Sequence, residues 1–184
     1  MNKKEVTFLG LRYLILIALG IYNLYLFYLI FTPVTVHLVY YLLSNLSEGV
    51  VLVSSGKISS IFLKGYIAQI IPACVAGSAY YLLLILNLTT PMNPKKRIGS
   101  LFFLFGSFLI INVLRITIFA LLVPKGYQYF NVAHELTWYV GSTIMLAIIW
   151  FANILIFRIK KVPVYSDLKS VYNDAIKHRG ENDF

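Results

Sequence analysis

The sequence predicts an all-α protein: a polytopic transmembrane helical bundle of about four spans, with one further candidate helix that is re-entrant or interfacial. Hydrophobic residues make up 59% of the chain and charged residues only 12%, whereas soluble domains carry about 25% charged residues. The mean hydropathy is +0.78. Several apolar runs reach the ~20 residues that a helix needs to cross a bilayer core. These observations place the chain among integral membrane proteins.

Four apolar runs are predicted to span, and each ends at a proline or at basic residues. They cover residues 11–31, 66–88, 98–123 and 137–157. The first run follows Lys3 and Lys4 and closes at Thr32-Pro33. It is long enough to span, and no small-residue cleavage site follows it, so we expect a retained helix rather than a signal peptide.

The segment 33–64 between the first two spans is predicted to lie on the outer side. Residues 34–46 are apolar but too few to span comfortably, so a re-entrant helix and an interfacial helix are both open. A fifth span reaching Val53 is disfavoured because Glu48 and Gly49 interrupt it. Residues 50–60 are typical of short extended structure with a turn.

Basic residues flank the apolar runs and set the predicted orientation. The clusters are Lys3, Lys4 and Arg12, then Lys95, Lys96 and Arg97, and finally Arg158, Lys160 and Lys161. Because such residues mark the cytoplasmic side, both termini and the loop 91–97 are expected there. We predict one membrane domain, 1–161, and a cytoplasmic tail, 162–184. This placement, and not a basic stripe, accounts for the net charge of +9, so no nucleic-acid partner is expected.

Cys74 is the single cysteine of the chain and lies in the second apolar run. A lone cysteine forms no internal disulfide and offers no metal-binding spacing, so no cofactor is expected. One interpretation is a small, buried, apolar side chain. The alternative is a reactive thiol, because Pro72 disturbs the preceding turn and Gly77 and Ser78 give the same helix face a small profile.

Arg115 is the least expected residue of the third run. A guanidinium in the apolar core costs at least about 2.5 kcal/mol unless it is paired or hydrated, and it does not deprotonate. One interpretation is that the side chain reaches the outer headgroups. The other is that it faces a wet cavity and binds a negative charge, oriented by Asn112 three residues earlier on the same face.

His134 precedes the fourth run and is open to two interpretations. It is either an ordinary interfacial histidine beside Trp138 and Tyr139, or a base that titrates near neutral pH. The predicted topology places Cys74, Arg115 and His134 in the same leaflet. A thiol is nucleophilic as the thiolate, an imidazole can take its proton, and a guanidinium can stabilise the charge. The trio therefore predicts acyl transfer through a thioester.

These residues resemble the exosortase/archaeosortase family of membrane cysteine transpeptidases. The resemblance covers about residues 65–158 and is carried by Ala73-Cys74, by Asn112-x-x-Arg115-Ile116 and by His134. Family members often place Ser or Thr and then Gly directly after the cysteine, whereas here the glycine is Gly77. The resemblance implies that Cys74 is the nucleophile, His134 the general base or acid, and Arg115 the stabilising cation.

The same resemblance implies the substrate: a secreted protein with a C-terminal sorting signal, made of a short motif, an apolar helix and basic residues. Cleavage at the outer face would pass the new C-terminus to a lipid or another acceptor. Two other functions are weighed. A non-catalytic scaffold of a secretion or envelope complex would not need Cys74. A small transporter that binds an anion through Arg115 ranks last, because the sequence has no paired repeat.

Overall fold

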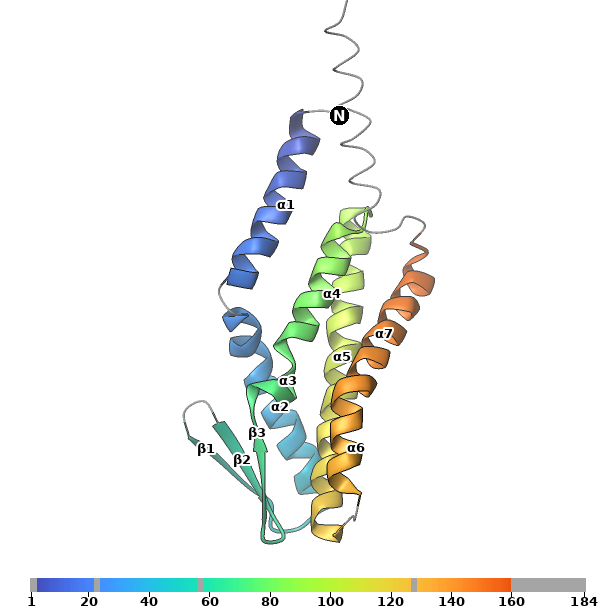
Figure 1. Cartoon of the computed structure of the whole chain (residues 1–184). Helices are drawn as coiled ribbons and strands as arrows, with labels where there is room; N and C mark the ends of the chain where they lie inside the picture. Colours follow the sequence, from blue (N-terminus) through green and yellow to red (C-terminus); the bar gives the residue numbers. More distant parts are fainter. Residues whose placement is uncertain (1–2, 22–23, 56–57, 127–128, 160–184) are drawn as a thin grey trace, which may run out of the picture.

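The chain folds as a helical bundle with a small antiparallel sheet against one side (Figure 1). The computed structural model describes residues 3–21, 24–55, 58–126 and 129–159. Four helical segments are long and apolar enough to cross a membrane, namely Tyr25–Leu46, Pro72–Thr89, Pro94–Leu122 and Phe130–Phe157. The predicted fold class is therefore confirmed. The predicted tail 162–184 lies outside the described residues.

The first predicted span is wrong in its boundaries. Residues 11–31 belong to two helices, α1 (Lys3–Ile21) and α2 (Tyr25–Leu46), which are separated at Leu24 in the left-handed conformation with φ 58°. Pro33 does not end a helix but lies inside α2. A proline removes one backbone donor, which an apolar helix packed against its neighbours tolerates. Residues 34–46, predicted as a separate short helix, are thus the second half of α2.

The segment after α2 forms three strands, β1 (Val51–Ser55), β2 (Ile58–Leu63) and β3 (Tyr66–Ile70), in the order β1-β2-β3. Extended structure at 50–60 is thereby confirmed. Lys64 and Gly65 join β2 to β3 with φ values of 48° and 82°, the conformation of a type I′ hairpin turn. The predicted start of the second span at residue 66 is wrong, because a short apolar strand cannot be told from a helix by its composition.

The remaining chain is helical almost throughout. It consists of α3 (Pro72–Val75), α4 (Gly77–Thr89), α5 (Pro94–Leu122), the 3₁₀ turn η1 (Val123–Lys125), α6 (Phe130–Leu136), the π-helical segment η2 (Thr137–Gly141) and α7 (Ser142–Phe157). The predicted span 98–123 lies within α5 apart from its last residue, and the predicted span 137–157 lies within the α6–α7 segment.

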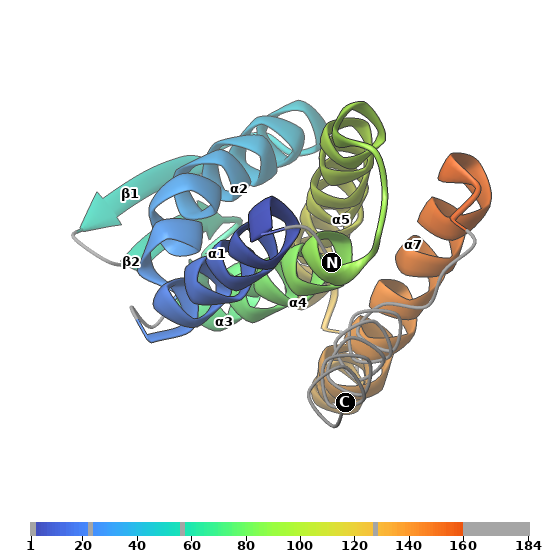
Figure 2. The same ribbon diagram turned by 90° about the horizontal axis from the view of Figure 1, so that it is seen from above.

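The long helix α5 is central, and α2, α4 and α7 pack around it (Figure 2). Near its middle the core is aromatic: Tyr80 of α4 is fully buried and stacks on Phe31 of α2 with ring centroids 3.7 Å apart. A second apolar cluster joins the sheet to α2 through Ile61, Leu63 and Leu43. Burying aromatic and branched side chains between these elements fixes the position of the sheet beside the bundle.

Polar side chains connect three helices near the α4–α5 loop. Asn87 of α4 donates to Ser100 of α5 at 2.7 Å, and Ser100 donates to Asn153 of α7 at 2.8 Å. All three residues are fully buried. Arg97 donates to three carbonyls at the end of α4, those of Asn87, Leu88 and Thr90. Interhelical hydrogen bonds of this kind hold membrane helices in register; we refer to Asn87, Ser100 and Asn153 as the polar cluster.

Candidate functional site

Cys74 lies at the corner where β3 turns into the helices. It is part of α3, a single turn that begins with Pro72 and is closed by a hydrogen bond from the Ala76 N–H to the Pro72 carbonyl at 3.1 Å. Ala76 has φ 57° and ψ 52°, so the helix stops there and α4 begins anew at Gly77. A left-handed alanine costs roughly 1–2 kcal/mol. The half-buried thiol therefore sits beside a strained backbone position, a feature found at functional sites.

Asn112 of α5 holds this corner in place. The break at Ala76 redirects the Ala79 N–H to the Ala76 carbonyl, so the carbonyls of Cys74 and Val75 lack the partners that a continuous helix would give them. The Asn112 side-chain amide donates to both, at 2.9 Å and 3.4 Å. Asn112 is fully buried. The structure thus assigns it to the Cys74 backbone and not, as expected from the sequence, to the orientation of Arg115.

Arg115 lies one turn further along the same face of α5 and is half-buried. Its Nη1 donates to the hydroxyl of Ser142 at the start of α7. Among the residues that the structure describes, no carboxylate pairs with Arg115. Because Asn112 bonds to the Cys74 carbonyl, Arg115 lies on the turn of α5 next to the Cys74 corner, and the cation has capacity for a further anionic partner.

A π-helical segment positions Ser142. Thr137–Gly141 winds more widely than an α-helix, and the Ser142 hydroxyl at its end donates to the Thr137 carbonyl at 3.4 Å. Such segments are rare and frequently occur at functional sites. The Ser142 hydroxyl therefore accepts a hydrogen bond from Arg115 and donates one to the Thr137 carbonyl, which fixes the direction of the guanidinium.

His134 of α6 packs on the next turn of α5. Its ring lies edge-on to Phe119 with centroids 5.2 Å apart and stacks on Phe130 at 5.7 Å. Within the described part of the chain the exposed imidazole contacts these rings and not the thiol. Asn112, Arg115 and Phe119 thus place the Cys74 corner, Ser142 and His134 along one stretch of α5. The Cys74 corner and Arg115 therefore lie at adjacent turns of α5, whereas the imidazole packs on Phe119 and Phe130.

The small face predicted at Gly77 and Ser78 divides into two environments. Gly77 is buried against α2, where a Cβ atom would lie 2.8 Å from Cζ of Tyr28 and 2.9 Å from its Cε1. Ser78 is exposed. The close approach at Gly77 is thus used by the protein's own tyrosine, and it fastens the helix that follows Cys74 to α2.

Gly77→Ala is expected to destabilise the protein by about 1–3 kcal/mol, because the added methyl group overlaps the Tyr28 ring. Gly106→Ala is the matched control. No atom lies within 4 Å of a Cβ atom there, and alanine is the better helix former by roughly 0.5–1 kcal/mol. Thermal unfolding of both purified variants in detergent measures the difference. Equal unfolding temperatures would contradict the close packing at Gly77.

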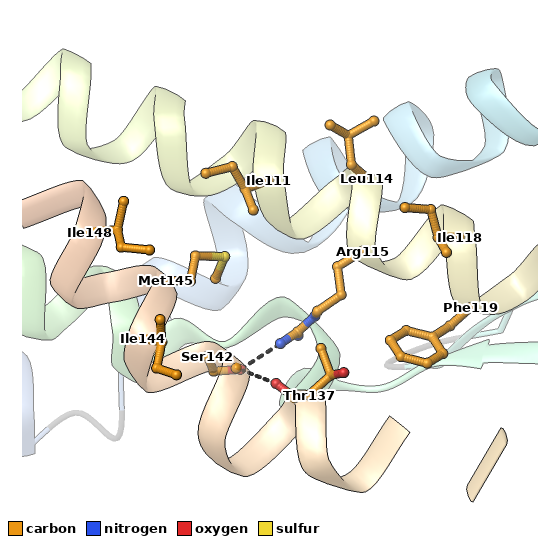
Figure 3. A pocket seen from close by; sticks show the side chains of 11 residues that line it. Ile111, Leu114, Arg115, Ile118, Phe119, Thr137, Ser142, Ile144, Met145 and Ile148 are labelled. Carbon is orange, nitrogen blue, oxygen red and sulfur yellow. Dashed lines mark hydrogen bonds between the residues drawn. The ribbon is translucent and has the colours of Figure 1, made fainter. Parts of the chain in front are cut away.

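An apolar groove of about 490 Å³ lies between α5 and the η2–α7 segment, with Arg115 in its wall (Figure 3). Aliphatic side chains from both sides line it, including Ile111, Leu114, Ile118, Ile144 and Ile148. The guanidinium points across the groove toward Ser142 and Thr137 (Figure 3). A groove with this lining suits an apolar chain or helix, and its single cation suits a negative charge that lies or develops beside it.

Ser142, Phe119 and Phe130 are site residues that sequence reasoning missed. Phe119 has a usable signal, since it lies four residues after Arg115 and therefore one turn along the same face. Ser142 has none, because the π-helical turns that direct it to Arg115 have no sequence signature. In the described part of the chain, no group of three His, Cys, Asp or Glu side chains is arranged to hold a metal ion.

Comparison with protein-family models, with curated proteins and with solved structures gave no match for this chain.

Proposed function

We propose that this chain is a membrane-embedded cysteine transpeptidase or peptidase. It cleaves the C-terminal sorting signal of secreted proteins at the outer face and passes the new C-terminus through a thioester to a lipid or another acceptor. The observation that carries the proposal is the position of Arg115. It lies one turn along α5 from Asn112, which holds the Cys74 backbone, and it has no carboxylate partner among the described residues. A guanidinium in apolar surroundings is costly unless it pairs with a negative charge.

In the first step, His134 takes the proton of the Cys74 thiol, and the sulfur attacks the carbonyl carbon of the scissile peptide bond. The carbonyl electron pair moves to its oxygen, and Arg115 stabilises that negative charge. When the intermediate collapses, the C–N bond breaks and the amine leaves with the proton from His134. The thioester now joins Cys74 to the new C-terminus of the substrate.

In the second step, the acceptor hydroxyl, or water, gives its proton to His134 and attacks the thioester carbonyl. The C–S bond breaks, and the returning thiolate recovers the proton. His134 has to turn from its aromatic contacts to the sulfur in both steps. Its exposed side chain supports this, since hydrogen bonds of a catalytic base are often formed only in the substrate complex.

The architecture supports the proposed orientation. Lys95 and Lys96 at the start of α5 and Arg158 at the end of α7 lie at the same end of the bundle (Figure 1), as expected for a cytoplasmic side. The sheet lies toward the other end, and α3, the turn that carries Cys74, connects it to α4 (Figure 1). The groove offers the apolar helix of a sorting signal a place next to the guanidinium of Arg115.

The thioester is the direct test. A suitable probe is an epitope-tagged secreted protein from the same organism that ends in a short motif, an apolar helix and basic residues. Incubated with the purified enzyme in detergent, it is expected to leave its N-terminal portion on Cys74, visible by intact mass and released by neutral hydroxylamine. Cleavage without any adduct at Cys74, after rapid acid quenching, would argue against covalent catalysis by this residue.

A further inference from the structure

Strand β3 has one free edge. It is the last strand of the order β1-β2-β3, and the described residues add no strand beyond it. The two-residue turn at Lys64-Gly65 makes Leu63 and Tyr66 a hydrogen-bonded pair. Because bonded and non-bonded pairs alternate in antiparallel sheets, Tyr66, Ala68 and Ile70 bond to β2. The backbone N–H and C=O groups of Ile67 and Gln69 therefore point away from the sheet.

These outward groups have no other backbone partner within the described chain. The side chains beside them are open as well, since Ile67 is 57% exposed and Gln69 is exposed. An unpaired strand edge is a template for a further extended chain, which it binds through main-chain hydrogen bonds.

The free edge leads directly to the candidate nucleophile. β3 ends at Ile70, and Cys74 follows within the one-turn helix that starts at Pro72. Figure 1 shows β3 running toward α3 and α4. An extended chain that lies along β3 in the same direction therefore reaches the level of the thiol after its last paired residue.

We propose that the edge of β3 binds the substrate segment that precedes the scissile bond as a parallel fourth strand. This inference rests on the proposed function and adds its recognition mode: an extended polypeptide, held by main-chain hydrogen bonds to Ile67 and Gln69. The parallel direction follows from the substrate's own order. Its motif comes before its apolar helix, just as β3 comes before α3 and α4, so both chains run from strand to helix.

Gln69→Pro tests the inference, because it removes an outward N–H and leaves the β2–β3 hydrogen bonds intact. We expect processing of the tagged sorting-signal protein to fall at least about tenfold below that of Gln69→Ala, which keeps the N–H. Ser54→Pro is the matched control. It places the same change on the outward edge of β1, on the far side of the sheet from β3, and should stay within about twofold of the natural protein.

Alkylation of Cys74 by a small maleimide at an unchanged rate would show that Gln69→Pro keeps its fold. Substrate variants provide a second, independent readout: proline at successive motif positions should impair processing at every second position. Full processing by Gln69→Pro, or proline sensitivity without this alternation, would overturn the inference. If Cys74→Ala still blocked processing in either case, the proposed function would stand. Processing by Cys74→Ala would instead refute the function itself.

Discussion

Cys74→Ala is expected to reduce processing of a sorting-signal substrate at least about a thousandfold, to the background level, because it removes the atom that forms the thioester. The change deletes one sulfur from a half-buried site, so the expected loss of stability is only about 1 kcal/mol. Immunoblots of the tagged substrate in cells that express each variant measure the ratio of precursor to product.

Cys74→Ser sharpens this test. Its hydroxyl has nearly the shape of the thiol but is a far weaker nucleophile when its neighbours are arranged for a thiolate. Both variants should keep the natural unfolding temperature to within a few degrees. Undiminished processing by Cys74→Ala would favour the scaffold function, which depends on packing surfaces and not on the thiol.

Arg115→Gln is expected to lower processing about 10²–10³-fold, since it removes the charge that stabilises the oxyanion. It should also slow alkylation of Cys74 by iodoacetamide, because it removes the cation that is proposed to stabilise the thiolate. Arg115→Lys keeps a charge but not the planar fork that reaches Ser142, so an intermediate loss is expected. Alkylation rates in detergent give a readout that needs no substrate.

Arg97→Gln is the control for removing an arginine. Arg97 donates to carbonyls at the end of α4, so its loss should lower the unfolding temperature and leave the alkylation rate of Cys74 unchanged. Arg115→Gln should show the opposite pattern. A cation without a carboxylate partner is costly in apolar surroundings, so its removal should not lower the unfolding temperature. An unchanged alkylation rate in Arg115→Gln would contradict the assigned role of the guanidinium.

The long apolar runs of the sequence made part of the fold predictable. The third and fourth spans are bounded by prolines and basic residues, and both were located from the sequence. The first was misplaced and the second was given a start that falls in β3, since hydropathy carries no information about where an apolar helix breaks. Leu24 and Ala76 adopt left-handed backbone conformations without glycine. Such positions are imposed by tertiary contacts, of which Asn112 at the Cys74 corner is the clearest example.

The candidate site shows the same contrast between residues that stand out in the sequence and contacts that depend on tertiary packing. Cys74 and Arg115 could be singled out because a thiol and a permanent charge stand out in apolar sequence, and the predicted topology placed them at one depth. The hydrogen bond between Arg115 and Ser142 depends on the π-helical turns before α7. The packing of His134 against Phe119 depends on how α6 meets α5. Neither feature has a local signature in the sequence.

The polar cluster has a mechanical consequence for the two helices that border the groove. It joins α5 to α7 near one end of the bundle through Ser100 and Asn153, and Gly99 lets Phe157 approach closely there. Between this cluster and the aromatic contacts of Phe119 with α6, mainly aliphatic side chains line the groove, and lipid replaces such contacts at little cost. We expect the groove to widen or narrow between these two joined regions according to the width of the apolar chain that it binds, while the polar cluster keeps the relative height of α5 and α7 unchanged.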